Sequence, residues 1–164
     1  MTSDPSDPTS FRKVLGRYPT GVCLVTGGPA NAEPVGMVVG SFTSVSLNPP
    51  LVAFLPARNS TSWPLIEASG AFCVNILGSE QEGACRRFAS RASNKFDGLG
   101  QRRASSGAPM LDNCLAWLDC TIENVVEAGD HYIALGRVTS MEIGNGRLPL
   151  IFYQGDYGSF IPQS

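Results

Sequence analysis

The stretch PVGMVVGSFTSVSLNPPLVAF, residues 34–54, combines strand-like apolar runs with a middle part built of small residues. The apolar runs at its two ends are typical of β-strands, and Pro49 and Pro50 separate the second run from the first. Where a core strand would carry large side chains, this chain has Gly40, Ser41, Thr43, Ser44 and Ser46. Such residues mark a place where another body, for example a flat aromatic ring, approaches the backbone closely. A sheet edge or a bulge with serines facing water predicts the same pattern.

Apolar patterning on both sides of this stretch predicts a mainly β protein. Strands are expected at residues 21–27, 35–47 as one long or broken strand, 51–55, 71–77, 116–122, 131–143 and 149–153. The sequence GNG at 144–146 is interpreted as a hairpin turn. Strands separated mainly by turns indicate an antiparallel barrel rather than a parallel doubly wound sheet.

Three short helices are expected between these strands. The first covers residues 11–18 behind the caps Thr9 and Ser10, and the second lies within 59–70 and starts near Thr61 or Ser62. A capping box of Ser79 with Glu82 predicts the third, which runs to about residue 88. Residues 89–109 are expected to form a long polar loop, and loops of that length are usually functional or mobile.

Length, composition and charge favour one domain without a nucleic-acid or membrane partner. The chain has 164 residues, 43% of them hydrophobic, so we expect a disordered tail at 1–10 and a single domain at 11–164. With a net charge of -2, the chain does not have the strongly positive potential of a dedicated nucleic-acid-binding module, so nucleic acid is not an expected partner. Residues 1–10 do not resemble a signal peptide, and no apolar run reaches membrane-spanning length. The sequence therefore predicts a cytoplasmic protein.

The cysteine and histidine content argues against a metal site. Five cysteines form an odd number without a CxxC pair, which indicates neither a disulfide framework nor a zinc cluster. His131 is the single histidine, and no HExxH motif is present. No metal is therefore expected.

Nucleotide-binding chemistry has to be sought outside the common phosphate motifs, because GxGxxG and the P-loop are both absent. A helix N-terminus with free backbone amides and side-chain hydroxyls can also bind a phosphate, and RNSTS at 58–62 offers such amides and hydroxyls. A plain helix cap has the same composition. Half of the chain's cations lie within 86–103, where they either face solvent or meet phosphates; they are Arg86, Arg87, Arg91, Lys95, Arg102 and Arg103.

Seven blocks of the sequence, in order, resemble the short-chain NAD(P)H:flavin oxidoreductases, the reductase components of two-component flavin-dependent monooxygenases. The blocks are FRKVLGRYPTGVCLVT, residues 34–54, STSWPLIEASGAFCVNIL, RRFA, KFDG, GDHYIALGRV and PLIFYQGDY. They extend from Phe11 to Tyr157, and the most telling are Gly129-Asp130-His131 and the serine-rich strand before Asn48.

This resemblance implies a split β-barrel (the flavin-reductase-like, FMN-binding barrel) that forms a homodimer with flavin near the subunit interface. It also implies hydride transfer from NADH or NADPH to N5 of FAD or FMN, and release of reduced flavin to a monooxygenase partner. In such a reaction the cofactors undergo the redox step and the protein mainly positions them, so no catalytic acid or base is expected.

The resemblance also implies a set of site residues. Along the flavin ring it places Pro34, Val35, Gly36, Met37 and Val38, with contacts from Gly40 and Ser41. Beside the ribityl chain it places Leu55, Pro56 and Ala57, and at the phosphate Thr61, Ser62, Arg87 and Phe88. At the nicotinamide nucleotide it places His131, Tyr153, Gln154, Gly155 and Asp156.

Two of these positions leave alternatives open. His131 is either a nicotinamide contact or a turn residue on the Asp130 hairpin. Gln154 stands where relatives commonly have arginine, and loss of that charge could weaken pyridine-nucleotide binding or alter the choice between NADH and NADPH. A non-catalytic flavin carrier on the same fold is therefore the alternative function. A third is an enzyme that holds flavin tightly and acts directly on an organic substrate.

Overall fold

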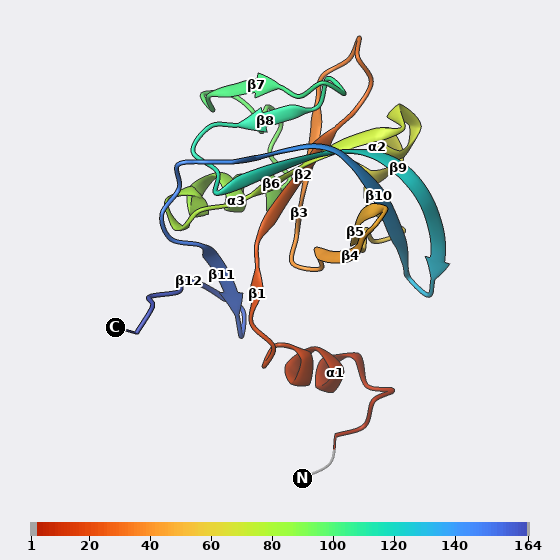
Figure 1. Ribbon diagram of the computed structural model, residues 1–164. Coiled ribbons are helices and arrows are strands. Elements are labelled where there is room, and N and C mark those ends of the chain that lie inside the picture. Colours follow the sequence, from red (N-terminus) through yellow and green to blue (C-terminus); the bar gives the residue numbers. More distant parts are fainter. Residues whose placement is uncertain (1–2, 164) are drawn as a thin grey trace.

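A seven-stranded antiparallel sheet dominates the computed structural model, which describes residues 3–163 (Figure 1). Its strands run in the order β3-β2-β6-β9-β10-β5-β4. Their bounds are β2 Cys23–Gly27, β3 Val35–Val39, β4 Thr43–Leu47, β5 Pro50–Phe54, β6 Ala71–Ile76, β9 Ala116–Ala128 and β10 His131–Ile143. The first apolar run of the 34–54 stretch, β3, and its small-residue middle, β4, are thus the two edges of one sheet, whereas its last run, β5, lies inside the sheet.

Two smaller sheets and three short helices complete the described chain. The small sheets are β1-β11-β12, made of Thr20–Gly21, Leu150–Tyr153 and Asp156–Ser159, and β7-β8, made of Gln101–Arg103 and Pro109–Leu111. The helices are α1 Pro8–Leu15, α2 Trp63–Ser69 and α3 Glu82–Ala89, with the 3-10 turn η1 Ser79–Gln81 before α3. The predicted mainly β fold with a few short helices is confirmed. None of the helices within residues 3–163 is long and apolar enough to span a membrane.

The core consists of two apolar clusters, one on each face of the central strands. Successive residues of β6 belong to different clusters, because neighbouring side chains of a strand point to opposite faces. Phe54 is the centre of one cluster and makes edge-to-face contacts with Trp63 and Phe72 at centroid distances of 5.6 and 5.1 Å. The other cluster packs under α3 and the β7-β8 arm and includes Leu24 and Phe88.

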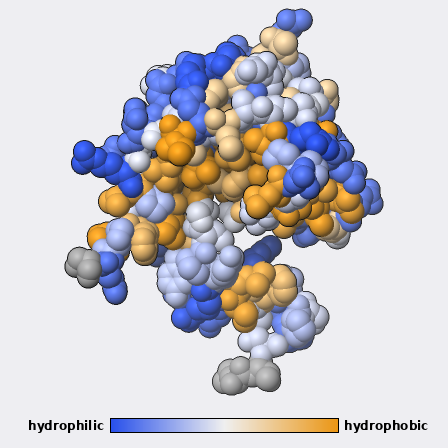
Figure 2. Space-filling model, viewed as in Figure 1, coloured by the Kyte–Doolittle hydropathy of each residue, from blue (hydrophilic) through white to orange (hydrophobic). Residues whose placement is uncertain are grey.

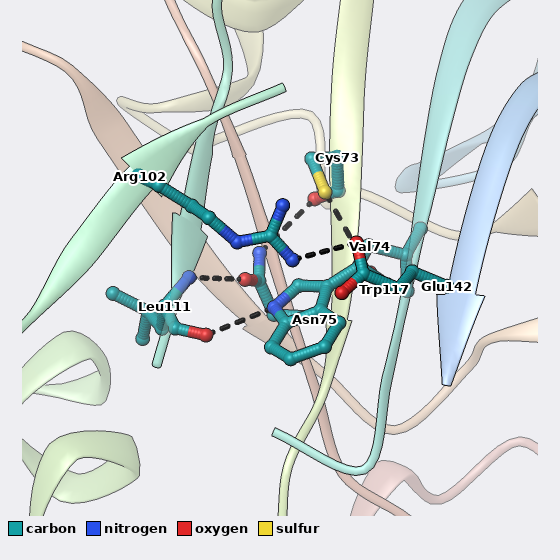
Figure 3. Close-up of polar contacts among 7 residues, drawn as sticks. All are labelled: Cys73, Val74, Asn75, Arg102, Leu111, Trp117 and Glu142. Atoms are coloured by element: carbon teal, nitrogen blue, oxygen red, sulfur yellow. Dashed lines mark hydrogen bonds and ion pairs between the residues drawn. The ribbon is translucent and has the colours of Figure 1, made fainter. Parts of the chain in front are cut away.

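Polar contacts attach the β7-β8 arm to the main sheet (Figure 3). Asn75 Oδ1 accepts a hydrogen bond from the Leu111 backbone N at 2.7 Å, and Trp117 Nε1 donates to the Leu111 carbonyl at 2.9 Å. Arg102 lies over the Trp117 ring, 5.0 Å from its centroid, and pairs with Glu142 at 2.7 Å. The arm covers buried residues of β6 and β9. The interactions of Asn75, Trp117 and Arg102 hold it in this position.

Two helix starts differ from the sequence prediction. The first helix begins at Pro8, and its cap is Asp7, whose carboxylate accepts from Thr9 N at 3.2 Å and Ser10 N at 3.0 Å. Residues 8–10 of the expected tail are thus helical, and residues 1–2 lie outside the described range. The Ser79 capping box is also wrong, because Gln81 Oε1 accepts from Gly78 N at 2.9 Å instead.

Two loop predictions are wrong as well. The segment 89–109 is not loop throughout, because it contains β7, which pairs with β8 at residues 109–111. The GNG sequence does not close a hairpin, because β10 pairs with β9 and β5 whereas β11 pairs with β1 and β12. Glycine suits this crossing between sheets, since a Cβ at Gly144 would collide with the Cys114 carbonyl.

Candidate functional site

The edge strand β3 carries the predicted ring-binding residues. An edge strand leaves alternate backbone N–H and C=O groups without a neighbouring strand. Two helices flank β3 near its middle, at Gly36. A Cβ on Gly36 would lie 2.8 Å from Cε1 of Phe88 in α3, and the Ser62 hydroxyl before α2 donates to the Gly36 carbonyl at 3.4 Å. The structure thus brings the predicted residues Gly36, Ser62 and Phe88 together.

The turn from β3 to β4 contacts the end of β5. Ser41 Oγ accepts a hydrogen bond from Leu55 N at 2.9 Å, which joins two predicted flavin contacts from different strands. Gly40 is needed for a contact inside the chain, because a Cβ there would lie 2.9 Å from the Thr20 hydroxyl oxygen. The body that approaches the backbone at Gly40 is therefore β1 of the same chain.

The segment after β5 lies against the turn that carries His131. Ala57 forms a bridge with His131, and Tyr132 N donates to the Pro56 carbonyl at 2.9 Å. His131 is the first residue of β10, and its Nδ1 lies 2.7 Å from Oδ1 of Asp130. This hydrogen bond lowers the pKa of the Asp130 carboxyl below its usual value.

The start of α2 leaves predicted phosphate-binding hydroxyls outside the helix cap. Ser60 supplies the cap, because its Oγ accepts from Trp63 N at 3.1 Å. Ser62 makes no side-chain cap bond, and Thr61 is exposed. Ser60 was not singled out from the sequence, although it lies in the same RNSTS run.

The end of α3 places Arg87 on the surface and Phe88 in the core. Arg87 Nη1 donates to the Asp97 carbonyl at 2.5 Å, and Phe88 stacks edge-to-face with Phe96 at 4.8 Å. Lys95 Nζ donates to the Phe88 carbonyl at 2.9 Å. The loop after α3 is thus held against the helix end by two of the basic residues of the 86–103 segment.

The predicted residues Tyr153, Gln154, Gly155 and Asp156 form the β11-β12 turn, with φ of 52° at Gln154 and 92° at Gly155. Gln154 N donates to the Gly16 carbonyl at 3.1 Å. When the amide oxygen is assigned to face Arg17, it accepts from Arg17 Nη1 at 2.8 Å. In Figure 1 this turn lies beside β1, well away from the β9-β10 turn, so one chain does not bring these residues and His131 together.

Two cavities, of about 220 and 280 Å³, lie outside this set of residues. The smaller lies between the β7-β8 arm and β10, and the larger lies between η1 and the segment 98–100. Neither cavity is lined by any predicted cofactor-binding residue. The candidate site is therefore the surface along β3 and the two segments beside it, 55–57 and 60–62.

The chemistry of the described residues offers no reactive thiol or metal centre. All five cysteines are buried and free, and burial raises the pKa of Cys23 to about 12 and that of Cys114 to about 11. No group of three or more metal-ligating side chains occurs in the part of the chain that the structure describes. Among the described residues, the candidate site therefore has neither a reactive thiol nor a metal centre.

Comparisons with known proteins identify the family. Residues 15–160 match the flavin reductase like domain. A flavin reductase of Pseudomonas putida is 54% identical over 154 residues, which cover 94% of this chain and 91% of that protein. The chain belongs to the flavin reductase-like family. The reductase subunit HsaB of a flavin-dependent monooxygenase from Rhodococcus jostii, strain RHA1, is 43% identical, and the match covers 99% of this chain and 83% of that subunit.

A solved structure supports the same family fold. Streptomyces globisporus C-1027 NADH:FAD oxidoreductase SgcE6, in complex with NAD and FAD fragments, has a TM-score of 0.93 and 37% identity to this chain. The match covers 100% of this chain and 99% of that chain. The resemblance predicted from the ordered sequence blocks is thereby confirmed.

In this flavin reductase-like domain, most of the predicted flavin set lies around β3. Pro34, Val35, Met37 and Val38 accompany Gly36 along the edge strand or at its start, and Gly40 with Ser41 follows it. Sequence reasoning missed Arg58, whose backbone N donates to the Asp130 carbonyl at 2.9 Å. A long-range contact of this kind leaves no local sequence pattern.

Proposed function

We propose that this protein is an NAD(P)H-dependent flavin reductase that transfers a hydride from NADH or NADPH to FAD or FMN and supplies the reduced flavin to a separate monooxygenase. The observation that carries the proposal is the match to the flavin reductase family over residues 15–160, and the position of the predicted residues 34–38, 40 and 41 along or just after the edge strand β3 supports it. A relative named as a flavin reductase supports the reduction of flavin, and a relative named as a monooxygenase reductase subunit supports its delivery to a separate monooxygenase.

The residues around β3 fit a flavin. The free strand edge offers backbone donors and acceptors of the kind that the polar edge of a flat ring can bind. Ser62 is not used to cap α2 and can therefore bind a phosphate, and Arg87 on α3 carries a positive charge that suits the same group. We place the ring along residues 34–38 and the ribityl chain beside residues 55–57.

The task of the protein is to hold two ligands in register. Bound flavin supplies the hydride-accepting chemistry, and proximity of donor and acceptor can contribute up to about 7–11 kcal/mol to the rate. His131 adjoins Ala57, so it is suited to orient the nicotinamide next to the flavin segment. Asp130 holds Nδ1 of His131, which leaves Nε2 free to contact a ligand.

We infer that FAD and NADH are the pair used, because the similar SgcE6 is named an NADH:FAD oxidoreductase. Gln154 bears on this choice. The sequence resemblance implies an arginine at its position, and Arg17 supplies a guanidinium next to it. We place the protein in the cytoplasm, where reduced nicotinamides are available.

We further propose a homodimer of split barrels. The helix α1 has no buried residue, and Phe11, Val14 and Leu15 are each about half exposed on it. Figure 2 shows hydrophobic residues on α1, which stands apart from the main body. Large exposed apolar side chains on one amphipathic helix fit a contact with a second copy. The separation of His131 from the β11-β12 turn within one chain fits a nicotinamide site at a subunit interface.

The proposed activity is tested by a steady-state assay that crosses FAD and FMN with NADH and NADPH under air. We expect flavin-dependent loss of NADH, fastest with FAD. No flavin-dependent loss with any combination would refute the proposal. If the protein instead quenches flavin fluorescence without consuming NADH, it is a flavin carrier, the alternative that Gln154 favours.

A further inference from the structure

The segment after β5 and the β9-β10 turn continue one antiparallel ladder beyond its regular end. The strands pair Phe54 with Ala134, and the same register continues through the hydrogen bond from Tyr132 N to the Pro56 carbonyl and the Ala57–His131 bridge. It ends where Arg58 N donates to the Asp130 carbonyl at 2.9 Å. Ala57 and His131, which the sequence resemblance implies contact two different ligands, are therefore direct cross-strand neighbours.

The Arg58 side chain binds this extension of the ladder to the β9-β10 hairpin. Its Nη2 lies 2.7 Å from Glu127 Oε1, and its Nη1 donates to the Gly129 carbonyl at 3.4 Å. The guanidinium also lies over the Tyr132 ring at 5.2 Å from the centroid. These three partners lie on β9, on the turn and on β10. One side chain thus connects the flavin segment with all three parts of the hairpin that presents His131.

A second ion pair on the same two strands shows what is particular to Arg58. Arg137 on β10 binds Glu123 on β9 through two hydrogen bonds of 2.9 and 2.6 Å. The two arginines have nearly equal side-chain exposure, 43% for Arg58 and 42% for Arg137. Arg137 joins two strands that a long ladder already holds together, whereas Arg58 joins a segment outside the regular strands.

Stability alone does not account for the Arg58 contacts. Exposed ion pairs contribute little to stability because solvent screens them, and Glu127 is well exposed, with 73% of its side chain accessible. What the contacts do fix is geometry, because they restrain the distance between residues 56–57 and His131. Hydride transfer depends steeply on such distances, and a 1 Å displacement can cost about 100-fold in rate.

We propose that Arg58 is a positioning residue of the reductase, which holds the flavin segment 55–57 in register with His131 so that nicotinamide and flavin meet at reacting distance. It touches neither ligand and acts through Ala57 and the β9-β10 turn. The inference rests on the proposed function and adds to it a residue that sets the rate of the transfer step. Flavin binding itself depends mainly on β3 and on Ser62, which Arg58 does not contact.

The test is anaerobic stopped-flow measurement of flavin reduction by NADH and by NADH deuterated at the transferred position, together with the flavin Kd from fluorescence quenching. The variants are Arg58→Ala, Arg58→Lys and Glu127→Gln, and the matched control is Arg137→Ala. For Arg58→Ala we expect the hydride-transfer rate to fall about 10-fold while the flavin Kd changes less than about 2-fold. The isotope effect should persist, because hydride transfer remains the step that is measured.

The conservative and partner variants distinguish positioning from folding. Arg58→Lys should recover part of the rate, because an ammonium group can still pair with Glu127. Glu127→Gln should reduce the rate in the same direction by a smaller factor, and Arg137→Ala should match the wild-type rate. Equal rates for Arg58→Ala and Arg137→Ala would overturn the inference, as would a loss of rate that only reflects weaker flavin binding. A wild-type protein that reduces no flavin would overturn the proposed function as well, so the two failures are distinguishable.

Discussion

Ser62 combines two properties that suit a phosphate ligand. Its hydroxyl is not used by the helix cap, which Ser60 provides, and it lies at the junction of α2 and β3 through its contact with the Gly36 carbonyl. The hydroxyl can turn its single proton from this carbonyl to an anion without breaking a cap bond. The residue therefore allows a direct test of the proposed flavin orientation.

We expect Ser62→Asp to raise the flavin Kd at least about 10-fold, because a second negative charge would face the phosphate. Fluorescence-quenching titrations with FAD and FMN measure this change. Ser140→Asp is the control, since Ser140 is exposed on β10 beside the smaller cavity, outside the candidate site. Equal Kd values for the two variants would show that the phosphate lies elsewhere.

Gly36 and Gly40 show what a single sequence can predict about such a site. The pattern of small residues included Gly40 among the places where another body approaches the backbone, and the group that approaches it is Thr20 of the same chain. Gly36 was predicted only from the resemblance, and the group that approaches it is Phe88. Both partners are distant in sequence, so only the folded structure identifies them. The family resemblance predicts a set of flavin residues because it compares whole blocks, whereas the pairing of Ala57 with His131 followed only from the fold.

At the scale of elements, strands were easier to predict than caps and loops. Periodic apolar residues determine a strand wherever one face is buried, so β2, β5, β6 and β10 match their predicted ranges closely. The strand β7 was missed because its three residues are all exposed and show no apolar alternation. It exists because β8 pairs with it and because Arg102 lies over Trp117.

The position of the β7-β8 arm depends on the buried side-chain amide of Asn75. Replacing Asn75 with Leu removes the acceptor for the buried Leu111 N–H, and an unsatisfied buried donor costs about 1–3 kcal/mol. We expect Asn75→Leu to lower the unfolding free energy by that amount and to speed hydrogen exchange of the β7 and β8 amides. Asn124→Ala, at an exposed position on β9, is the control and should leave both unchanged. Unaltered exchange in Asn75→Leu would mean that other contacts hold the arm.

At the scale of the whole molecule, the exposed face of α1 predicts self-association. We expect a mass of twice 17.4 kDa for the wild type in size-exclusion chromatography with light scattering, and 17.4 kDa for the double variant Phe11→Asp, Leu15→Asp. Charges on this face would have to be desolvated on association, which is costly. Lys13→Asp on the same helix is the charge-matched control and should remain dimeric. A monomeric wild type, or a dimeric double variant, would contradict this assembly.

A reductase that supplies a separate monooxygenase takes up flavin as a substrate and releases it reduced. The most direct measurement mixes catalytic amounts of the protein with excess FAD and limiting NADH without oxygen and follows the visible flavin absorbance. For such a reductase we expect FAD to be bleached in proportion to the NADH added, to many times the protein concentration. Bleaching that stops at one flavin per protein chain, or no bleaching at all, would contradict it.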